Sequence, residues 1–220
     1  MSRTIDITKT VYKFSELDDG AKQNALEDYV LNGIDYDWWD CIEERLKESM
    51  AEIGIHVEKM YFSGFSSQGD GACFEGQVDD WAKFLWRTGL WKQYPRCFAN
   101  AGELGFLTWK CRGRYTHENS LEFDDCSMLT AIHPCIDRIN YAETDEEAEV
   151  AQIVFNSFTD LEFSYELEDL REEVIEFVRE KSRETYRSLR DDYDYLTSLE
   201  AFAEACDANE WEFDSEGNLV

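Results

Sequence analysis

Two short segments near the middle of the chain alternate apolar and polar residues with the two-residue period of a β-strand. They are residues 55–63, IHVEKMYFS, and residues 72–78, ACFEGQV. Between them runs GFSSQGDG, whose glycines at 64, 69 and 71 can adopt the positive φ values that a tight connection requires. The pattern predicts an antiparallel hairpin in which residues 64–71 join the two strands.

Other segments repeat their apolar residues every three or four positions, which is the spacing of one face of an α-helix. The longest such segment runs from Asp160 to about Tyr193, with Glu and Arg filling the positions between the apolar ones. We expect further helices that begin at Ser15 as N-cap, at Asp35, near Asp79 and at Thr197-Ser198, together with an acidic helix over residues 143–158.

The remaining patterns predict strands at both ends of the chain and a second hairpin. Residues 4–14 are expected to form a strand, residues 104–115 and 119–126 a hairpin, and residues 211–220 a terminal hairpin. The fold class is therefore α+β: an antiparallel sheet from the middle of the chain with helices packed on it, including a long C-terminal helix. Because no Ser/Gly-rich linker interrupts the pattern, residues 1–220 are expected to form a single compact domain.

The charge of the chain changes this picture most. It carries 49 Asp and Glu against 21 Lys and Arg, a net charge of −28. The imbalance is concentrated in the C-terminal half, since residues 111–220 hold 30 acids and 9 bases whereas residues 1–110 hold 19 and 12. Direct binding of nucleic acid is disfavoured, because phosphates attract clusters of Lys and Arg. The charge favours a protein partner with a basic surface, although acidity that serves solubility alone is the competing interpretation.

The acidic residues after Asp169 are the main candidates for such a surface. Carboxylates four residues apart on a helix are about 6 Å apart, near the phosphate spacing of one DNA strand. Arg171, Arg179, Arg183, Arg187 and Arg190 interleave with them, so a solvated helix with internal ion pairs remains the alternative. The candidate partner-binding residues are Glu172, Glu173, Glu176, Glu180, Asp191, Asp192 and Asp194.

The glycine-rich connection is a second candidate. Its backbone amides could hold an anion, and Gln68, Gly69, Asp70 and Gly71 could face a ligand. The structural alternative is a tight turn in which Asp70 hydrogen-bonds to nearby backbone. Cys73 beside the turn could act as a nucleophile, but no Cys/His signature accompanies it, and a buried thiol is the common case.

No pattern predicts a cofactor, a metal site or a disulfide framework. The seven cysteines are odd in number and contain no C-x-x-C, and the spacing of His117, Cys126, His133 and Cys135 matches no standard zinc site. The chain shows no apolar signal segment and no apolar run of transmembrane length, so we expect a cytoplasmic protein with reduced thiols. With no catalytic constellation, we do not expect an enzyme.

The tryptophans are a further set of candidates. Trp38, Trp39, Trp81, Trp86 and Trp91 could stack on nucleic-acid bases, but stacking grooves are normally basic and this chain is acidic. Packing in the core and anchoring of a protein interface are the favoured roles.

Several stretches resemble a family of acidic, uncharacterised phage and prophage proteins that are often labelled antitoxin-like. They are VYKFSEL at 11–17, DWWD at 37–40, FSGFSSQGDGACFEG at 62–76 and ANEWEF at 208–213. The resemblance implies an accessory role in a phage-infected cell and assigns no residue a function. Combined with the charge, it suggests an inhibitor that binds a host defence or nucleic-acid-handling protein through an acidic, DNA-mimicking surface. The alternatives are an antitoxin-like neutraliser of a basic toxin and an enzyme with a site around residues 64–71.

Overall fold

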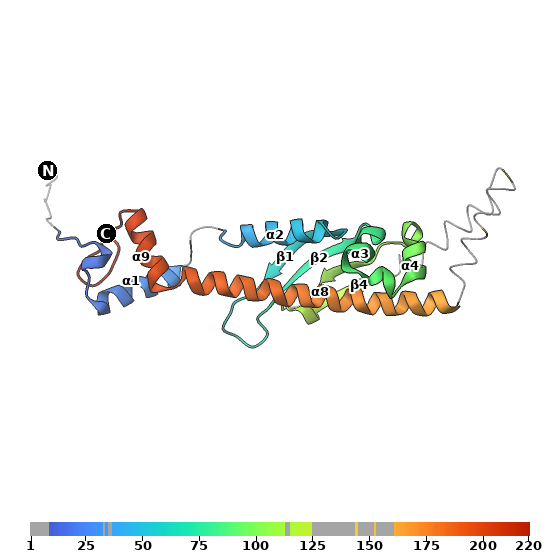
Figure 1. The fold of residues 1–220 in the computed structure, drawn as a ribbon. Coiled ribbons are helices and arrows are strands. Elements are labelled where there is room, and N and C mark those ends of the chain that lie inside the picture. The colour runs from blue at the N-terminus through green and yellow to red at the C-terminus, as the bar shows by residue number, and fades with distance from the viewer. Residues whose placement is uncertain are drawn as a thin grey trace, which may run out of the picture. The chain divides into compact units, whose positions relative to one another are not determined.

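The protein is described by a computed structural model that covers residues 9–32, 34, 37–112, 115–124, 144, 152 and 161–220. The described elements include a four-stranded antiparallel sheet in the middle of the chain, several helices and a long C-terminal helix, so the α+β prediction is confirmed (Figure 1). Contacts divide the chain into one unit of Met1–Asp40 with Ser188–Val220 and another of Cys41–Arg187. We refer to them as the terminal unit and the central unit, and the single-domain organisation stays a prediction.

The sheet of the central unit has the strand order β1-β2-β3-β4, with every neighbouring pair antiparallel. Its strands are β1 (Ile55–Phe62), β2 (Ala72–Val78), β3 (Thr108–Cys111) and β4 (Leu121–Asp124). A shift of register between Val57 and Lys59 lets Ile55, Val57 and Met60 all face the core. The predicted hairpin with its connection at residues 64–71 is confirmed, and the second hairpin is confirmed with shorter strands.

Helices α2 (Asp40–Ala51), α3 (Trp81–Thr88) and α4 (Pro95–Ala99) accompany the sheet. Ile42, Leu46 and Met50 form the buried face of α2, and the helix begins at Asp40 rather than at the predicted Asp35. Asp80 caps α3 by accepting a hydrogen bond from the backbone N–H of Lys83 at 2.9 Å. The chain turns into β1 through Gly54, whose φ is 85°.

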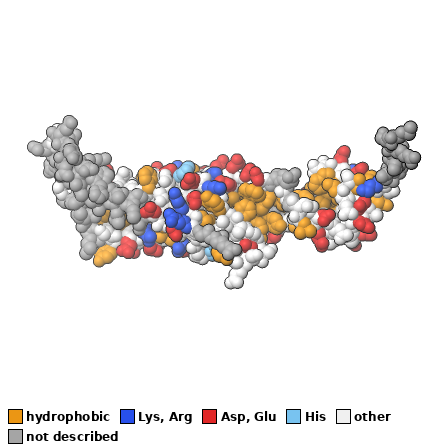
Figure 2. Space-filling view, turned by 180° about the vertical axis from the view of Figure 1, so that it is seen from behind, with side chains coloured by type: hydrophobic (Ala, Val, Ile, Leu, Met, Phe, Trp, Pro, Cys, Tyr) orange, Lys and Arg blue, Asp and Glu red, His pale blue; other side chains and the backbone are white. Residues whose placement is uncertain are grey.

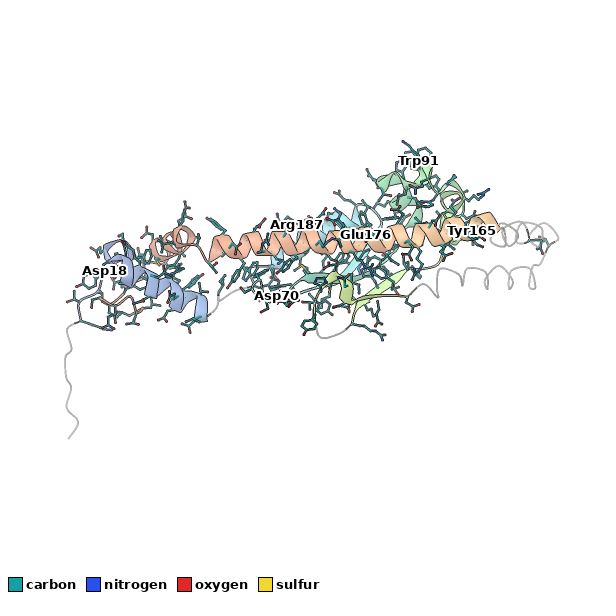
Figure 3. All side chains as sticks on the ribbon, turned by 90° about the horizontal axis from the view of Figure 1, so that it is seen from below. Asp18, Asp70, Trp91, Tyr165, Glu176 and Arg187 are labelled. Carbon is teal, nitrogen blue, oxygen red and sulfur yellow. The ribbon has the colours of Figure 1, made fainter. Side chains whose placement is uncertain are left out.

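Helix α8 (Leu161–Leu196) is the predicted long helix, and it runs alongside the sheet in both ribbon views (Figures 1 and 3). Its buried face carries Phe163, Leu167, Leu170, Val174, Ile175 and Val178. Ser182 and Thr185 extend this face, and each hydroxyl donates to the carbonyl four residues earlier, at 2.9 and 2.8 Å. The buried polar groups are thereby satisfied within the helix.

The terminal unit contains α1 (Asp19–Asn32), α9 (Leu199–Ala208) and a short C-terminal turn. Its core is an aromatic-rich cluster formed by Phe14, Leu17, Ala21, Ala25, Phe202, Cys206 and Phe213. Single bridges join Tyr12 to Phe213 and Phe213 to Leu219, so the described part of the predicted 4–14 strand contributes one pair only. Residues 4–8 lie outside the described part.

Two helix starts in the terminal unit differ from prediction. Ser15 lies in a short 3-10 turn (Phe14–Glu16), and the Asp18 carboxylate instead accepts from the backbone N–H of Ala21 at 2.8 Å. At α9 the N-cap is Ser198 rather than Thr197, with its hydroxyl accepting from the Ala201 N–H at 3.2 Å. The helix expected over residues 143–158 lies outside the described residues.

Candidate functional site

All seven carboxylates predicted to bind a partner lie on α8. Glu172, Glu173, Glu176 and Glu180 belong to the central unit, and Asp191, Asp192 and Asp194 belong to the terminal unit. The two groups are therefore considered separately. On the face drawn in Figure 2, acidic side chains are spread over the described surface with Lys and Arg among them, so this face offers no uniformly acidic plane.

Arginines neutralise part of the acidic face in the central unit. Arg183 donates to Glu180 at 2.7 Å and also pairs with Glu176, while Arg187 reaches Glu180 at 3.0 Å. The hydrogen bonds that Arg183 and Arg187 donate lower the pKa of Glu180, and those that Arg183 donates to Glu176 and Glu180 raise its own pKa. Glu176 and Glu180 therefore form ion pairs with arginines of their own helix, which is the alternative interpretation of this face. Figure 3 labels Glu176 and Arg187 on α8.

A groove beside this helix keeps its negative charge. It has a volume of about 480 Å³ and is lined by Gln93, Tyr94, Asp169, Glu172, Glu173, Ile175, Glu176 and Arg179. Asp169 and Glu173 form no ion pair with any residue that the structure describes. Burial raises the pKa of the Tyr94 phenol, and the charges of Glu173 and Asp169 raise it further. The lining therefore holds four carboxylates against one basic side chain, Arg179.

The three candidate aspartates of the terminal unit lie near the C-terminal end of α8. Asp191 lies 4.0 Å from Arg190, which is the outer limit of an ion pair. Asp192 is half-buried and has a partner, whereas Asp194 is exposed. Of the sequence-predicted candidates in this unit, Asp191 and Asp194 are the more accessible.

The connection between β1 and β2 is organised by Asp70. Its Oδ2 accepts hydrogen bonds from the backbone N–H groups of Ser66 and Ser67, at 2.9 and 2.6 Å. The Gly71 N–H donates to the Ser63 hydroxyl at 3.1 Å, and Gly69 has a φ of 98°. Gln68 is exposed and forms no hydrogen bond within the described chain. The Asp70 carboxylate, which the sequence suggested as a ligand-binding group, therefore stabilises the loop by accepting its backbone hydrogen bonds.

Replacing Asp70 with alanine is expected to lower the free energy of unfolding by about 1–2 kcal/mol, because two backbone donors lose a charged acceptor. Gln68→Ala is the control and should change stability by less than about 0.5 kcal/mol. Denaturant unfolding of both variants measures the difference. Unchanged stability in Asp70→Ala would contradict the structural role and return Asp70 to the ligand-binding candidates.

The residues around Cys73, next to the loop, do not activate its thiol as a nucleophile. Cys73 is buried, and burial together with its hydrogen bond to the Cys111 thiol raises its pKa. His117 comes close to Gly71, but its Nδ1 accepts from the Asn119 N–H at 3.2 Å. Within the described residues no three His, Cys, Asp or Glu side chains are grouped so that they could hold a metal ion. Cys126, His133 and Cys135 lie outside that part of the chain.

Some tryptophans are buried in the core and others are exposed, and the sequence did not predict which are which. Trp38, Trp81 and Trp109 are buried, and Trp81 donates its indole N–H to the Gly105 carbonyl at 2.8 Å. Trp86 is exposed and stacks on Trp91, with ring centroids 5.4 Å apart. Figure 3 places Trp91 on the opposite side of α8 from Asp70.

No helix among the described residues is both long and apolar enough to span a lipid bilayer.

Comparison with known proteins gives a family without an assigned activity. No curated protein and no solved structure matches the chain. A family model described as a domain of unknown function, DUF8835, matches residues 38–199, which include the whole sheet and all of α8. The chain therefore belongs to the DUF8835 family.

Proposed function

We propose that this protein is a binding protein that engages a basic partner through the carboxylates of α8. The observation that carries the proposal is the groove beside α8, in which Asp169 and Glu173 form no ion pair with a described residue. Burial raises the pKa of the Tyr94 phenol beside them, and their charges raise it further. Carboxylates that are left unpaired inside a groove are available to Lys or Arg of another protein. Together with the net charge of −28, they would also steer a basic partner toward the surface.

The biological setting of the proposal is that of an accessory phage protein acting in the cytoplasm of a host cell. The resemblance of residues 62–76 to phage and prophage proteins supports it, and a host defence or nucleic-acid-handling protein would supply the basic surface. An antitoxin-like role, in which the partner is a basic toxin, would use the same carboxylates. The enzyme alternative has less support, because Asp70 is occupied by backbone donors and the Cys73 pKa is raised.

Reversing the two unpaired groove charges with Asp169→Lys and Glu173→Lys is expected to weaken capture of the partner on the order of tenfold, mostly through slower association. The matched control is Glu44→Lys with Glu48→Lys, which makes the same change of net charge at exposed positions of α2. Affinity capture from host lysate at low and high salt, followed by association rates with the captured protein, measures the effect. Equal loss in both double variants would indicate steering by net charge alone.

The three candidate aspartates of the terminal unit are tested with a separate triple variant, Asp191→Lys with Asp192→Lys and Asp194→Lys. If these residues also contact the partner, its association should slow in this variant and the slowing should diminish with salt. A partner whose affinity changes neither with salt nor in either set of variants would refute the acidic-surface proposal.

A further inference from the structure

One stretch of this acidic chain holds no acidic residue. Residues 81–102 contain Lys83, Arg87, Lys92 and Arg96 and neither Asp nor Glu. They form α3, a 3-10 turn (Leu90–Lys92), α4 and the turn that follows it. The central unit therefore carries a local basic segment whose sign is opposite to that of the groove beside α8.

Three aromatic rings cluster on this segment, and we call Trp86, Trp91 and Phe98 the aromatic patch. Trp86 lies nearly parallel to Trp91, at 5.4 Å and 21°, and to Phe98, at 6.3 Å and 27°. The Trp86 side chain is nevertheless 59% exposed. Exposed tryptophan that is held rigidly by other rings is typical of interface anchors, because little side-chain entropy is lost on binding.

Two cations of this segment have no carboxylate partner among the described residues. Arg87 and Lys92 are exposed, and neither forms an ion pair within the part of the chain that the structure describes. The Lys92 ammonium lies 5.6 Å from the centroid of the Trp91 ring. Arg96 is different, since it pairs with Glu166 at 3.8 Å, and the same carboxylate accepts from the backbone N–H groups that begin α4.

We infer that the aromatic patch, with Arg87 and Lys92, is a second interaction surface that binds an acidic protein segment bearing an apolar anchor. Charge complementarity selects the acidic partner, and the exposed Trp86 ring selects an apolar side chain within it. This surface is distinct from the acidic groove proposed above, and it does not depend on the groove having a basic partner.

The neighbourhood of the patch argues against a nucleic acid or an anionic membrane as the occupant. The Glu166 carboxylate accepts a hydrogen bond from the backbone at the start of α4. Asp169 and Glu173 line the groove beside α8, which also includes Tyr94 of the basic segment. A polyphosphate chain or a charged bilayer would extend over these carboxylates and be repelled. A short segment with one or two carboxylates beside a Leu, Phe or Trp could contact Arg87, Lys92 and Trp86 without covering those carboxylates.

A peptide array tests the inference on the full chain. The probes are synthetic peptides with a central Leu, Phe or Trp flanked by Asp and Glu, with matched sets in which the acids become Lys or the central residue becomes Ala. We expect binding only to the acidic, apolar-centred set, and a loss of affinity of about tenfold or more in Trp86→Ala. Arg87→Glu with Lys92→Glu should weaken the same peptides and reduce the salt dependence.

Control variants separate the patch from general effects. Tyr165→Ala removes an exposed aromatic side chain elsewhere on the central unit, and Lys110→Glu reverses an exposed charge on β3; both should bind as the wild type does. Equal binding of the acidic, Lys-substituted and Ala-centred sets would overturn the inference. Trp86-dependent binding of oligothymidylate or of phosphatidylserine vesicles, with no binding of the acidic peptides, would overturn it in favour of those ligands.

Discussion

Phe202→Ala is expected to lower the free energy of unfolding of the terminal unit by about 3–5 kcal/mol, the range found when a buried phenylalanine is truncated. Phe202 is 2% exposed and lies at the centre of that unit's aromatic core. Its ring centroid is 4.9 Å from that of Tyr29, 5.1 Å from Phe14 and 6.2 Å from Trp211. Because rings from α1, α9 and both chain ends meet there, surrounding groups cannot collapse into the space without moving several elements.

Denaturant unfolding followed by far-UV circular dichroism and by tryptophan fluorescence measures this change, since Trp211 is in contact with the altered site. Leu199→Ala is the control: this residue lies in the first turn of the same helix with 47% of its surface exposed. It should change stability by less than about 0.5 kcal/mol. A loss below about 1 kcal/mol in Phe202→Ala would show that the aromatic cluster does not hold the unit together.

Gly76→Ala is expected to destabilise the central unit by about 3 kcal/mol or more, through overpacking rather than through a cavity. A Cβ atom at Gly76 would collide with the backbone carbonyl oxygen of His56 on β1, and the Trp109 ring would lie 3.3 Å away on β3. The obstructing oxygen belongs to a strand in the hydrogen-bonded sheet, so relief requires the strands to separate.

Gly102→Ala is the matched control, because no other atom lies within 4 Å of a Cβ atom built there. It should leave the unfolding midpoint unchanged or raise it slightly, since alanine restricts the unfolded chain. Thermal and denaturant unfolding of the two variants compare them directly. Equal stability of Gly76→Ala and Gly102→Ala would mean that β1 and β2 do not approach as closely as described.

The sequence predicted the central hairpin and α8 because each is long enough for its period to be unambiguous. Ile55, Val57, Phe74 and Val78 alternate as a half-buried sheet requires, and α8 repeats its apolar residues through 36 positions. Helix starts were less predictable, because Ser15, Thr197 and Asp35 are good cap residues beside the caps or turns actually used. Which of these residues begins the helix depends on tertiary packing, such as the burial of Phe14 and Trp38.

The candidate surfaces could be predicted only in part. The acidity of α8 is plain in the sequence, but the pairing of Arg183 with both Glu176 and Glu180 depends on rotamers that a spacing rule does not give. The groove was missed because Gln93 and Tyr94 lie more than seventy residues before Asp169. The aromatic patch was missed because whole-chain charge obscured the acid-free stretch at residues 81–102, which a local charge count would have identified.

The buried stripe of α8 has a consequence for how its length can change among related proteins. Phe163, Val174 and Thr185 follow one another at steps of eleven, as do Leu167 and Val178. Eleven residues turn a helix of about 3.6 residues per turn about 20° past three full turns, so the stripe drifts only slightly around the axis along the helix. Inserting one residue would rotate everything beyond it by about 100° and turn carboxylates toward the sheet. Insertions or deletions that keep the stripe in line should therefore be close to a whole number of turns, such as about seven, eleven or eighteen residues.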